Sequence, residues 1–252
     1  MSQAARQKFI RRWHRRLGPI IGIQLLAWSL GGLYFSWVHI TLVRSEMDIA
    51  AAEPPDLKFE NYLAPLPPLI RNSELAGVEH IELGKLLNLP VYRLTQDDHH
   101  AETYNAITGE RISPFARETA VAVAEADFAP QVPVKGATLV ENQGGEYRGP
   151  VPVWKVEFSN WKATAIYVSA ETGKVTARRS SIWRAYDILW MFHIMDYGAR
   201  KNFNNWILRS MSILGVTTIV SGYYLWYLTT PLLGPTRRAQ SRSPRRQRTR
   251  KR

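Results

Sequence analysis

The side chains best suited to chemistry in this sequence of 252 residues are its six histidines. Three of them stand at the edges of two long apolar runs, namely His14, His39 and His193. Ionisable side chains in such positions are candidates for a functional site. No Ser/His/Asp triad, zinc-binding motif or Gly-rich phosphate loop stands out, and no cysteine is present. Disulfides, thiolate metal sites and cysteine nucleophiles are therefore excluded.

Asp97-Asp98-His99-His100 is the other place where ligand-type side chains cluster. Carboxylates and imidazoles at this density could hold a metal ion. The four residues fall, however, between two short segments with the alternating pattern of β-strands. We therefore interpret them as a solvated hairpin tip rather than a metal site.

Two uncharged runs of 27 residues predict membrane-spanning helices. The first, Leu17–Val43, would extend about 40 Å as a helix, which exceeds the ~30 Å hydrocarbon core of a bilayer. Six Lys/Arg residues precede it, and its end (Tyr34, Trp37, His39) lacks the small residues of a cleavage site. We therefore expect an uncleaved signal anchor. The second run, Ser210–Thr236, is followed by nine Lys/Arg residues.

The charges are segregated along the chain. The formal net charge is +12, yet all 21 acidic residues lie between Glu46 and Asp196, and residues 44–203 carry 17 Lys/Arg, which makes that stretch −4. The ends carry 16 Lys/Arg and no acid. By the positive-inside rule, we expect both termini in the cytoplasm of a bacterial inner membrane and the central part outside it. The basic tail has no interleaved aromatic residue, so we expect it to contact anionic lipid headgroups rather than nucleic acid.

The central part contains an internal repeat of two predicted β-hairpins. Residues 91–94 and 104–111 form the strands of the first, and residues 153–156 and 167–175 form those of the second. The copies are offset by 62 residues at their first strands and by 64 residues at their Thr-Gly turns. Glycine suits such a turn because it accepts a positive φ without strain.

Helices are predicted around the hairpins. Ser113–Ala124 offers Ser113 as an N-cap, Pro114 in the first turn and then an Ala-rich run. Pro68–Leu75 is its shorter counterpart before the first hairpin. A further amphipathic segment, residues 180–200, carries aromatic residues on one helical face and is expected at the membrane interface. The central part is thus predicted to be an α+β domain of two helix-plus-hairpin halves.

The order of these elements resembles the PepSY domain and the PepSY-associated transmembrane helix family. Tyr167–Val175 is similar to the closing pattern Y-V-x-A-x-T-G-x-V of PepSY domains. Trp13–Gly18 (WHRRLG) resembles the H-R-x-L-G opening of the associated span, and Phe192–Gly198 stands where that family has its second histidine motif. The resemblance covers nearly the whole chain except the basic tail.

Together these features predict an extracytoplasmic α+β domain, made of two PepSY-like helix-plus-hairpin repeats, inserted between two transmembrane α-helices. The predicted boundaries are 1–16 for the basic cytoplasmic N-terminus, 17–43 for the first transmembrane helix, 44–65 for a linker, 66–179 for the periplasmic PepSY-like domain, 180–200 for the interfacial helix, 205–232 for the second transmembrane helix and 233–252 for the basic cytoplasmic tail.

The resemblance also implies a role for the histidines, because larger four-span relatives include haem-binding reductases that deliver electrons to ferric siderophores. The matching residues by position are His14 and His193, which are expected on opposite sides of the membrane and so cannot ligate one haem b together. His39 lies 25 residues after His14, about 37 Å along a helix, so His39 and His193 could share a haem at the outer face. His14 would need a ligand from a second protomer, as in a homodimer, or from another subunit. The alternative roles are interfacial packing for His39 and His193 and a plain polar position for His14.

Two functions are open at this point. One is an accessory or haem-binding component of a membrane redox system for iron-siderophore reduction, which would at most transfer electrons because no catalytic constellation is present. The other is a non-enzymatic, membrane-tethered binding module. PepSY domains resemble the propeptide region of secreted metallopeptidases, which implies that the domain restrains a periplasmic peptidase or binds another envelope partner.

Overall fold

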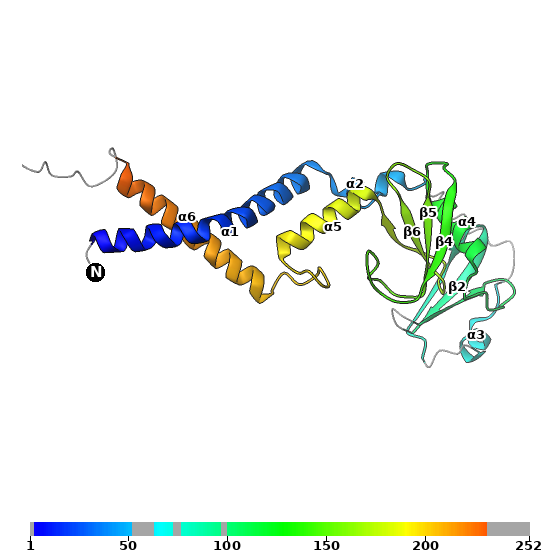
Figure 1. The fold of residues 1–252 in the computed structure, drawn as a ribbon. Coiled ribbons are helices and arrows are strands. Elements are labelled where there is room, and N and C mark those ends of the chain that lie inside the picture. Colours follow the sequence, from blue (N-terminus) through cyan, green and yellow to red (C-terminus); the bar gives the residue numbers. More distant parts are fainter. Residues whose placement is uncertain (1–2, 52–62, 73–76, 97–99, 231–252) are drawn as a thin grey trace, which may run out of the picture. The chain divides into compact units, whose positions relative to one another are not determined.

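The chain divides into two compact units, which differ in architecture. The computed structural model describes residues 3–51, 63–72, 77–96 and 100–230. The helical unit comprises Met1–Leu30 and Met191–Arg252, and the domain unit comprises Gly31–Trp190. Among the described residues, two helices are long and apolar enough to cross a membrane, and both are seen in Figure 1: α1 (Gln3–Trp37) and α6 (Trp206–Thr229).

The first helix runs through the basic flank and ends earlier than predicted. A helix over 17–43 was expected, but α1 stops at Trp37 and a separate short helix, α2 (Ile40–Val43), follows. The break falls at His39, whose backbone is extended (φ −62°, ψ 140°) and whose Nδ1 accepts a hydrogen bond from the Thr41 N–H at 3.4 Å. An N-cap of this kind starts a new helix instead of continuing the old one.

The second long helix also begins at a capped position. Asn205 Oδ1 accepts a hydrogen bond from the Leu208 N–H at 2.9 Å, and α6 begins at the residue after this cap. Ile21 of α1 and Gly215 of α6 are buried, whereas most other apolar side chains of the helical unit are exposed, including Ile20, Ile23, Leu26, Ile213, Val216, Ile219 and Val220. A pair of helices that is apolar on its outside suits a lipid environment.

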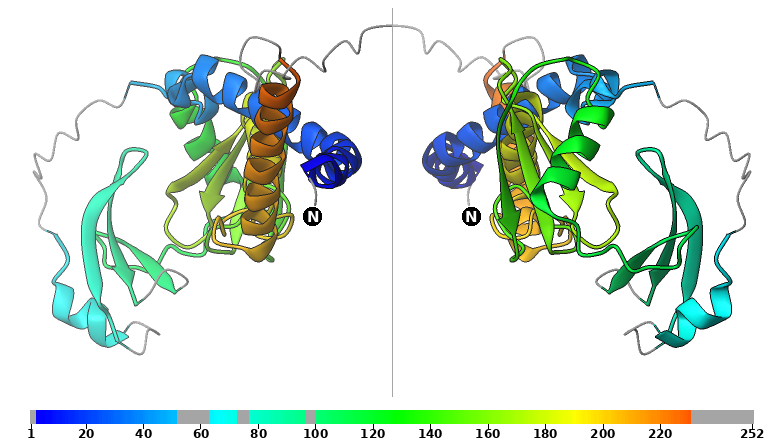
Figure 2. Two further views of the ribbon diagram at one scale, coloured as in Figure 1. Left: turned by 90° about the vertical axis from the view of Figure 1, so that its left-hand side faces the viewer. Right: turned by 90° about the vertical axis from the view of Figure 1, so that its right-hand side faces the viewer.

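The domain unit contains two antiparallel sheets, shown in Figure 2, with strand orders β1-β2-β3 and β4-β5-β6-β7. The strands are β1 (His80–Leu86), β2 (Leu89–Thr95), β3 (Ala101–Asn105), β4 (Val134–Val140), β5 (Val153–Phe158), β6 (Ala165–Ser169) and β7 (Val175–Arg179). The helices of this part are α3 (Leu66–Asn72), which precedes the first sheet, and α4 (Arg117–Asp127), which packs on the second. A 3-10 turn, Glu46–Asp48, follows α2. The predicted α+β class between two candidate spans is confirmed.

Both predicted hairpins are antiparallel strand pairs. β2 pairs with β3, which places Tyr92 opposite Tyr104, and β5 pairs with β6 in the same way. Strands β1, β4 and β7 were not predicted, and the second strand of each hairpin was predicted too long, since β6 ends at Ser169 rather than at 175. β3 ends at Asn105, and the chain then turns through Gly109 at a φ of 77°. That the two halves are copies of one PepSY unit stays a prediction.

Helix α4 begins later than predicted. Its N-cap is Ala116, and the predicted cap, Ser113, lies in the preceding connection, where its Oγ accepts a hydrogen bond from the Thr103 N–H at 3.0 Å. Ala120 and Ala124 are fully buried against the second sheet, in a core that also contains Phe128, Val156, Phe158, Ile166 and Val168. The first sheet has a separate core of Tyr92, Leu94, Tyr104 and Ala106. Small residues let α4 lie close to its sheet, as dense core packing requires.

Helix α5 (Ser181–Ile194) is shorter than the predicted 180–200 segment. Met195 adopts a left-handed backbone conformation (φ 53°), which ends the helix. Within the domain unit, the aromatic face of α5 packs on the last part of α1. The ring of Phe35 lies 4.8 Å from that of Tyr186 and 6.1 Å from that of Trp190, measured between centroids. The predicted interfacial position of α5 stays a prediction.

Candidate functional site

His14 has the geometry best suited to binding a ligand. It lies on α1 against α6, and its Nδ1 is 2.8 Å from the Ser221 hydroxyl oxygen. Ser221 has a single hydroxyl hydrogen, which it donates to the Thr218 carbonyl oxygen at 2.8 Å, so it accepts from His14. In this arrangement of hydrogen bonds, a neutral His14 carries its proton on Nδ1. Consequently, Nε2 carries the lone pair that a metal ion would use.

A groove of about 460 Å³ lies beside this imidazole in the helical unit and is lined by His14, Thr218, Ile219, Gly222, Tyr223 and Trp226. Gly222 of α6 leaves room for the ring: a Cβ built on it would approach His14 Cε1 to 3.1 Å and Nε2 to 3.8 Å. The walls are otherwise mainly apolar or aromatic. The groove thus offers one nitrogen ligand in apolar surroundings, as ligand sites commonly do.

His193 lies toward the other end of the helical unit. Trp28 Nε1 donates a hydrogen bond to the His193 carbonyl oxygen at 3.0 Å, and the two rings lie 6.2 Å apart at an angle of 52°. Trp28 follows His14 by 14 residues on the same helix, which corresponds to about 21 Å. This separation keeps His14 and His193 of one chain from ligating the same group.

His39 lies in the domain unit, at the start of α2, and its side chain is exposed. Its Nδ1 is 2.8 Å from the Thr41 hydroxyl oxygen and also accepts the helix-capping hydrogen bond. Capping is therefore the role that the local geometry assigns to this imidazole. Joint haem ligation by His39 and His193, which belong to different units, stays a prediction.

No group of three or more His, Asp or Glu within residues 3–51, 63–72, 77–96 and 100–230 is arranged to hold a metal ion. Three members of the acidic-histidine cluster, Asp97, Asp98 and His99, lie outside the described residues. The fourth, His100, is exposed. The interpretation of this cluster as a hairpin tip therefore stays a prediction.

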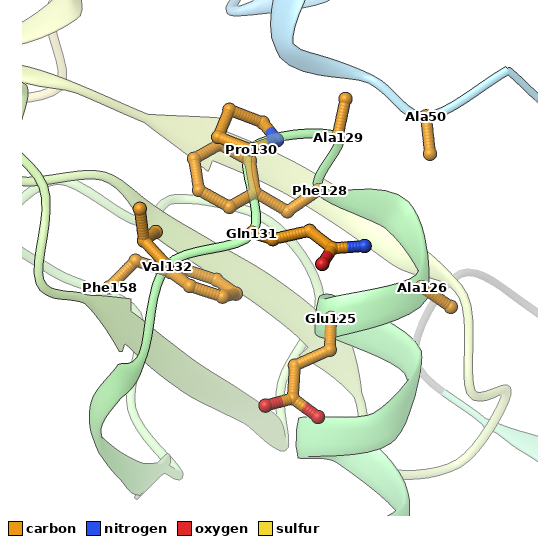
Figure 3. Close-up of a pocket in the computed structure, with 9 residues that line it drawn as sticks. All are labelled: Ala50, Glu125, Ala126, Phe128, Ala129, Pro130, Gln131, Val132 and Phe158. Atoms are coloured by element: carbon orange, nitrogen blue, oxygen red, sulfur yellow. The ribbon is translucent and has the colours of Figure 1, made fainter.

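A second pocket lies in the domain unit at the C-terminal end of α4. It measures about 470 Å³, and Figure 3 shows its lining residues: Ala50, Glu125, Ala126, Phe128, Ala129, Pro130, Gln131, Val132 and Phe158. The buried rings of Phe128 and Phe158 lie 4.5 Å apart, between centroids, and give the pocket an aromatic wall. Glu125 and Gln131 add polar groups to the lining. Sequence reasoning missed this pocket because segments far apart in the chain form it and none of them carries a motif.

The family comparison covers the spans and the domain alike. The model of the PepSY-associated TM region matches residues 1–227. The chain belongs to this family. It is a membrane-associated PepSY protein, and the resemblance inferred from the segments around His14 and His193 is confirmed. Searches of curated proteins and of solved structures find no match.

In the domain of this PepSY-associated protein, the carboxylate of Glu146 gathers several donors. Arg184 of α5 donates to it from Nε at 2.6 Å, the Tyr167 hydroxyl donates at 2.8 Å, and Lys155 Nζ lies at 3.3 Å. Burial alone would raise the pKa of Glu146, but hydrogen bonds from Arg184 and Tyr167 and the charges of Arg184 and Lys155 lower it to about 2. Burial and the hydrogen bond to Glu146 raise the pKa of Tyr167. A carboxylate held ionised in this way stabilises the contact electrostatically and does not act as a proton donor.

Two further contacts join the same loop, sheet and helix of the PepSY domain. Arg148 and Asp187 form two hydrogen bonds of 3.2 and 3.3 Å. The guanidinium of Arg179 lies 4.1 Å from the ring centroid of Trp183, which is a cation–π distance. The first turns of α5 are therefore attached to the second sheet by several independent charged contacts.

Proposed function

We propose that this chain is a bacterial inner-membrane protein that binds haem b at His14 and acts as an electron-carrying, accessory component of a system that reduces ferric siderophores. The observation that carries the proposal is an imidazole with a free Nε2 lone pair, oriented by Ser221, in the wall of an apolar groove. Both termini lie in the cytoplasm and the domain in the periplasm. The segregation of all 21 acidic residues into the central part supports this orientation.

The residues around His14 fit a haem in three respects. Nε2 of His14 would be the ligand atom, because Nδ1 is engaged with Ser221. Gly222 leaves space beside the ring that any side chain would reduce. Arg11 and Arg15 flank His14 in the sequence and offer cations for the two anionic propionates.

A bound haem b supplies reversible one-electron transfer. Ser221 accepts the hydrogen bond from Nδ1–H, which fixes the orientation of the imidazole and increases the basicity of Nε2. The apolar groove limits the access of water to the ligand atom. Trp28, which contacts His193, lies about 21 Å from His14 along α1, so a second ligand would have to come from a second copy of the chain or from a reductase subunit.

An absorption spectrum of the full chain tests haem binding. The protein is expressed in haem-replete cells and purified in detergent, and a Soret band is expected. His14→Ala should abolish the band, whereas His80→Ala, at an exposed position on β1, should preserve it. A wild-type protein without a Soret band would refute the proposal. A band that survives His14→Ala but is lost in His39→Ala or His193→Ala would move the site to the other end of the spans.

The pocket on the domain favours a second candidate function, a membrane-tethered binding module for a periplasmic peptidase or another envelope partner. Its aromatic wall and the polar groups of Glu125 and Gln131 form a surface of the kind that takes up a side chain of a partner protein. A photo-cross-linker at Gln131 of the full chain should then capture a periplasmic protein, and the same group at Leu139 of β4 should not. Equal yields at both positions would rule out this use of the pocket.

A further inference from the structure

Large apolar side chains are exposed where α1 leads into the domain unit. Trp37, the last residue of α1, is 82% exposed, Ile40 of α2 is 42% exposed, and Met47 is 68% exposed. Trp161, in the turn between β5 and β6, is 82% exposed. Isolated apolar side chains are ordinary on protein surfaces, but several large ones on one part of the surface indicate an interaction site.

An ion pair links the turn between β5 and β6, which carries Trp161, to the segment that follows α2. Lys162 donates from Nζ to both carboxylate oxygens of Asp48, at 2.9 and 2.8 Å. Met47 directly precedes Asp48 in the sequence, so this ion pair brings Met47 and Trp161 into the same neighbourhood. The turn is itself braced by Asn160, whose side chain makes two hydrogen bonds of 2.8 Å across it.

Cations accompany these apolar side chains. Lys162 Nζ lies 5.7 Å from the ring centroid of Trp161. The side chain of Arg44, between Ile40 and Met47 in the sequence, is 65% exposed. Indole rings beside Lys and Arg side chains are the typical composition at the boundary between lipid and water, because the ring is apolar with one polar edge and the cations reach the phosphates.

We propose that Trp37, Ile40, Met47 and Trp161 form a membrane-docking surface through which the domain rests on the phospholipid headgroup layer. Trp37 ends a helix that is long enough to span the membrane, so the surface is continuous with the lipid contact of α1. Lys162 stays paired with Asp48 and holds the turn in place. Arg44, which is 65% exposed and lies 3.6 Å from Glu46, reaches the lipid phosphates, and the apolar side chains enter the boundary below it. The rigid turn at Trp161 gives the domain a second point of attachment besides the chain connection. The domain therefore keeps one orientation on the bilayer, whether or not haem is bound.

The proposal can be tested on the full chain in phosphatidylcholine nanodiscs. Because the chain has no cysteine, Trp161→Cys and Leu139→Cys each give one labelling position for the fluorophore NBD. Leu139 is a matched control, since it is also an exposed apolar residue of the second sheet but lies at the end of β4 far from the β5–β6 turn. We expect NBD at position 161 to emit at shorter wavelength, to lose quenching by iodide and to be quenched by lipids with a doxyl group at carbon 5. NBD at position 139 should respond to iodide alone.

A label-free measurement keeps the test independent of the probe. Trp161→Ser removes an exposed ring, so the fold should persist, and the amount of tryptophan emission lost on adding brominated lipid should fall relative to the wild type. Strong iodide quenching at position 161 would overturn the proposal. Protection from iodide without quenching by doxyl lipid would also overturn it, because protein rather than lipid would then cover Trp161. An unchanged response to brominated lipid in Trp161→Ser would count equally against it.

Discussion

Replacing Glu146 by Gln removes the charge on which three side chains of the domain converge. Arg184, Tyr167 and Lys155 all approach the same carboxylate, and Arg184 brings the first turns of α5 with it. Glutamine has nearly the same shape and can still accept one hydrogen bond. The variant therefore isolates the electrostatic part of the attachment between α5 and the second sheet.

The expected loss of stability follows from the lowered pKa of Glu146. A fall in the pKa from the ordinary value of 4.5 to about 2 corresponds to about 3 kcal/mol in favour of the ionised, folded state. The Glu146 side chain is 20% exposed, and solvent screening reduces this contribution, so we expect a loss of about 2 kcal/mol at neutral pH. For a domain of this size, such a loss lowers the melting temperature by about 4–8 °C.

The assay is thermal unfolding of the full chain in detergent, followed by near-ultraviolet circular dichroism, with hydrogen exchange of the α5 amides as a local readout. Glu125→Gln is the matched control, because Glu125 is exposed and no hydrogen bond or ion pair of its side chain is found among the described residues. We expect exchange in the first turns of α5 to accelerate in Glu146→Gln only. An unchanged melting temperature together with unchanged exchange would refute the electrostatic attachment.

Three further outcomes are expected. Because the pKa of Glu146 is depressed on folding, its contribution is complete above pH 4.5 and is lost as the pH falls toward about 2; the unfolding midpoint of the wild type should fall over this range more steeply than that of Glu146→Gln. Gly222→Ala should weaken the Soret band of the detergent-purified protein, because the added Cβ would lie 3.1 Å from His14 Cε1. A band of full intensity would show that haem binding does not require a glycine at this position. A single cysteine at Ile107 should react with an impermeant maleimide in intact spheroplasts, and a cysteine at Ser241 should react only after lysis; the reverse pattern would refute the orientation.

The membrane anchoring could be predicted from the sequence because it depends on contiguous composition. Two uncharged runs with basic flanks meet the length and charge requirements of spans wherever the rest of the chain lies. The pairing of β2 with β3 could also be predicted from the sequence, because the alternation of apolar and polar residues and the turn residues are properties of neighbouring positions. The strand β1 was missed because the alternation of polar and apolar residues over residues 80–83 is short and is interrupted at Gly84.

The His14 site depends on the tertiary structure. Ser221 lies 207 residues from His14 in the sequence. Neither Ser221 nor Gly222 belongs to a sequence motif that predicts a contact with an imidazole. The sequence determined that His14 stands at the basic edge of a span. Only the packing of α1 on α6 decided which of its nitrogens contacts Ser221, how close Gly222 approaches and where the groove opens. Such contacts depend on the relative placement of two helices, which the composition of neither helix determines.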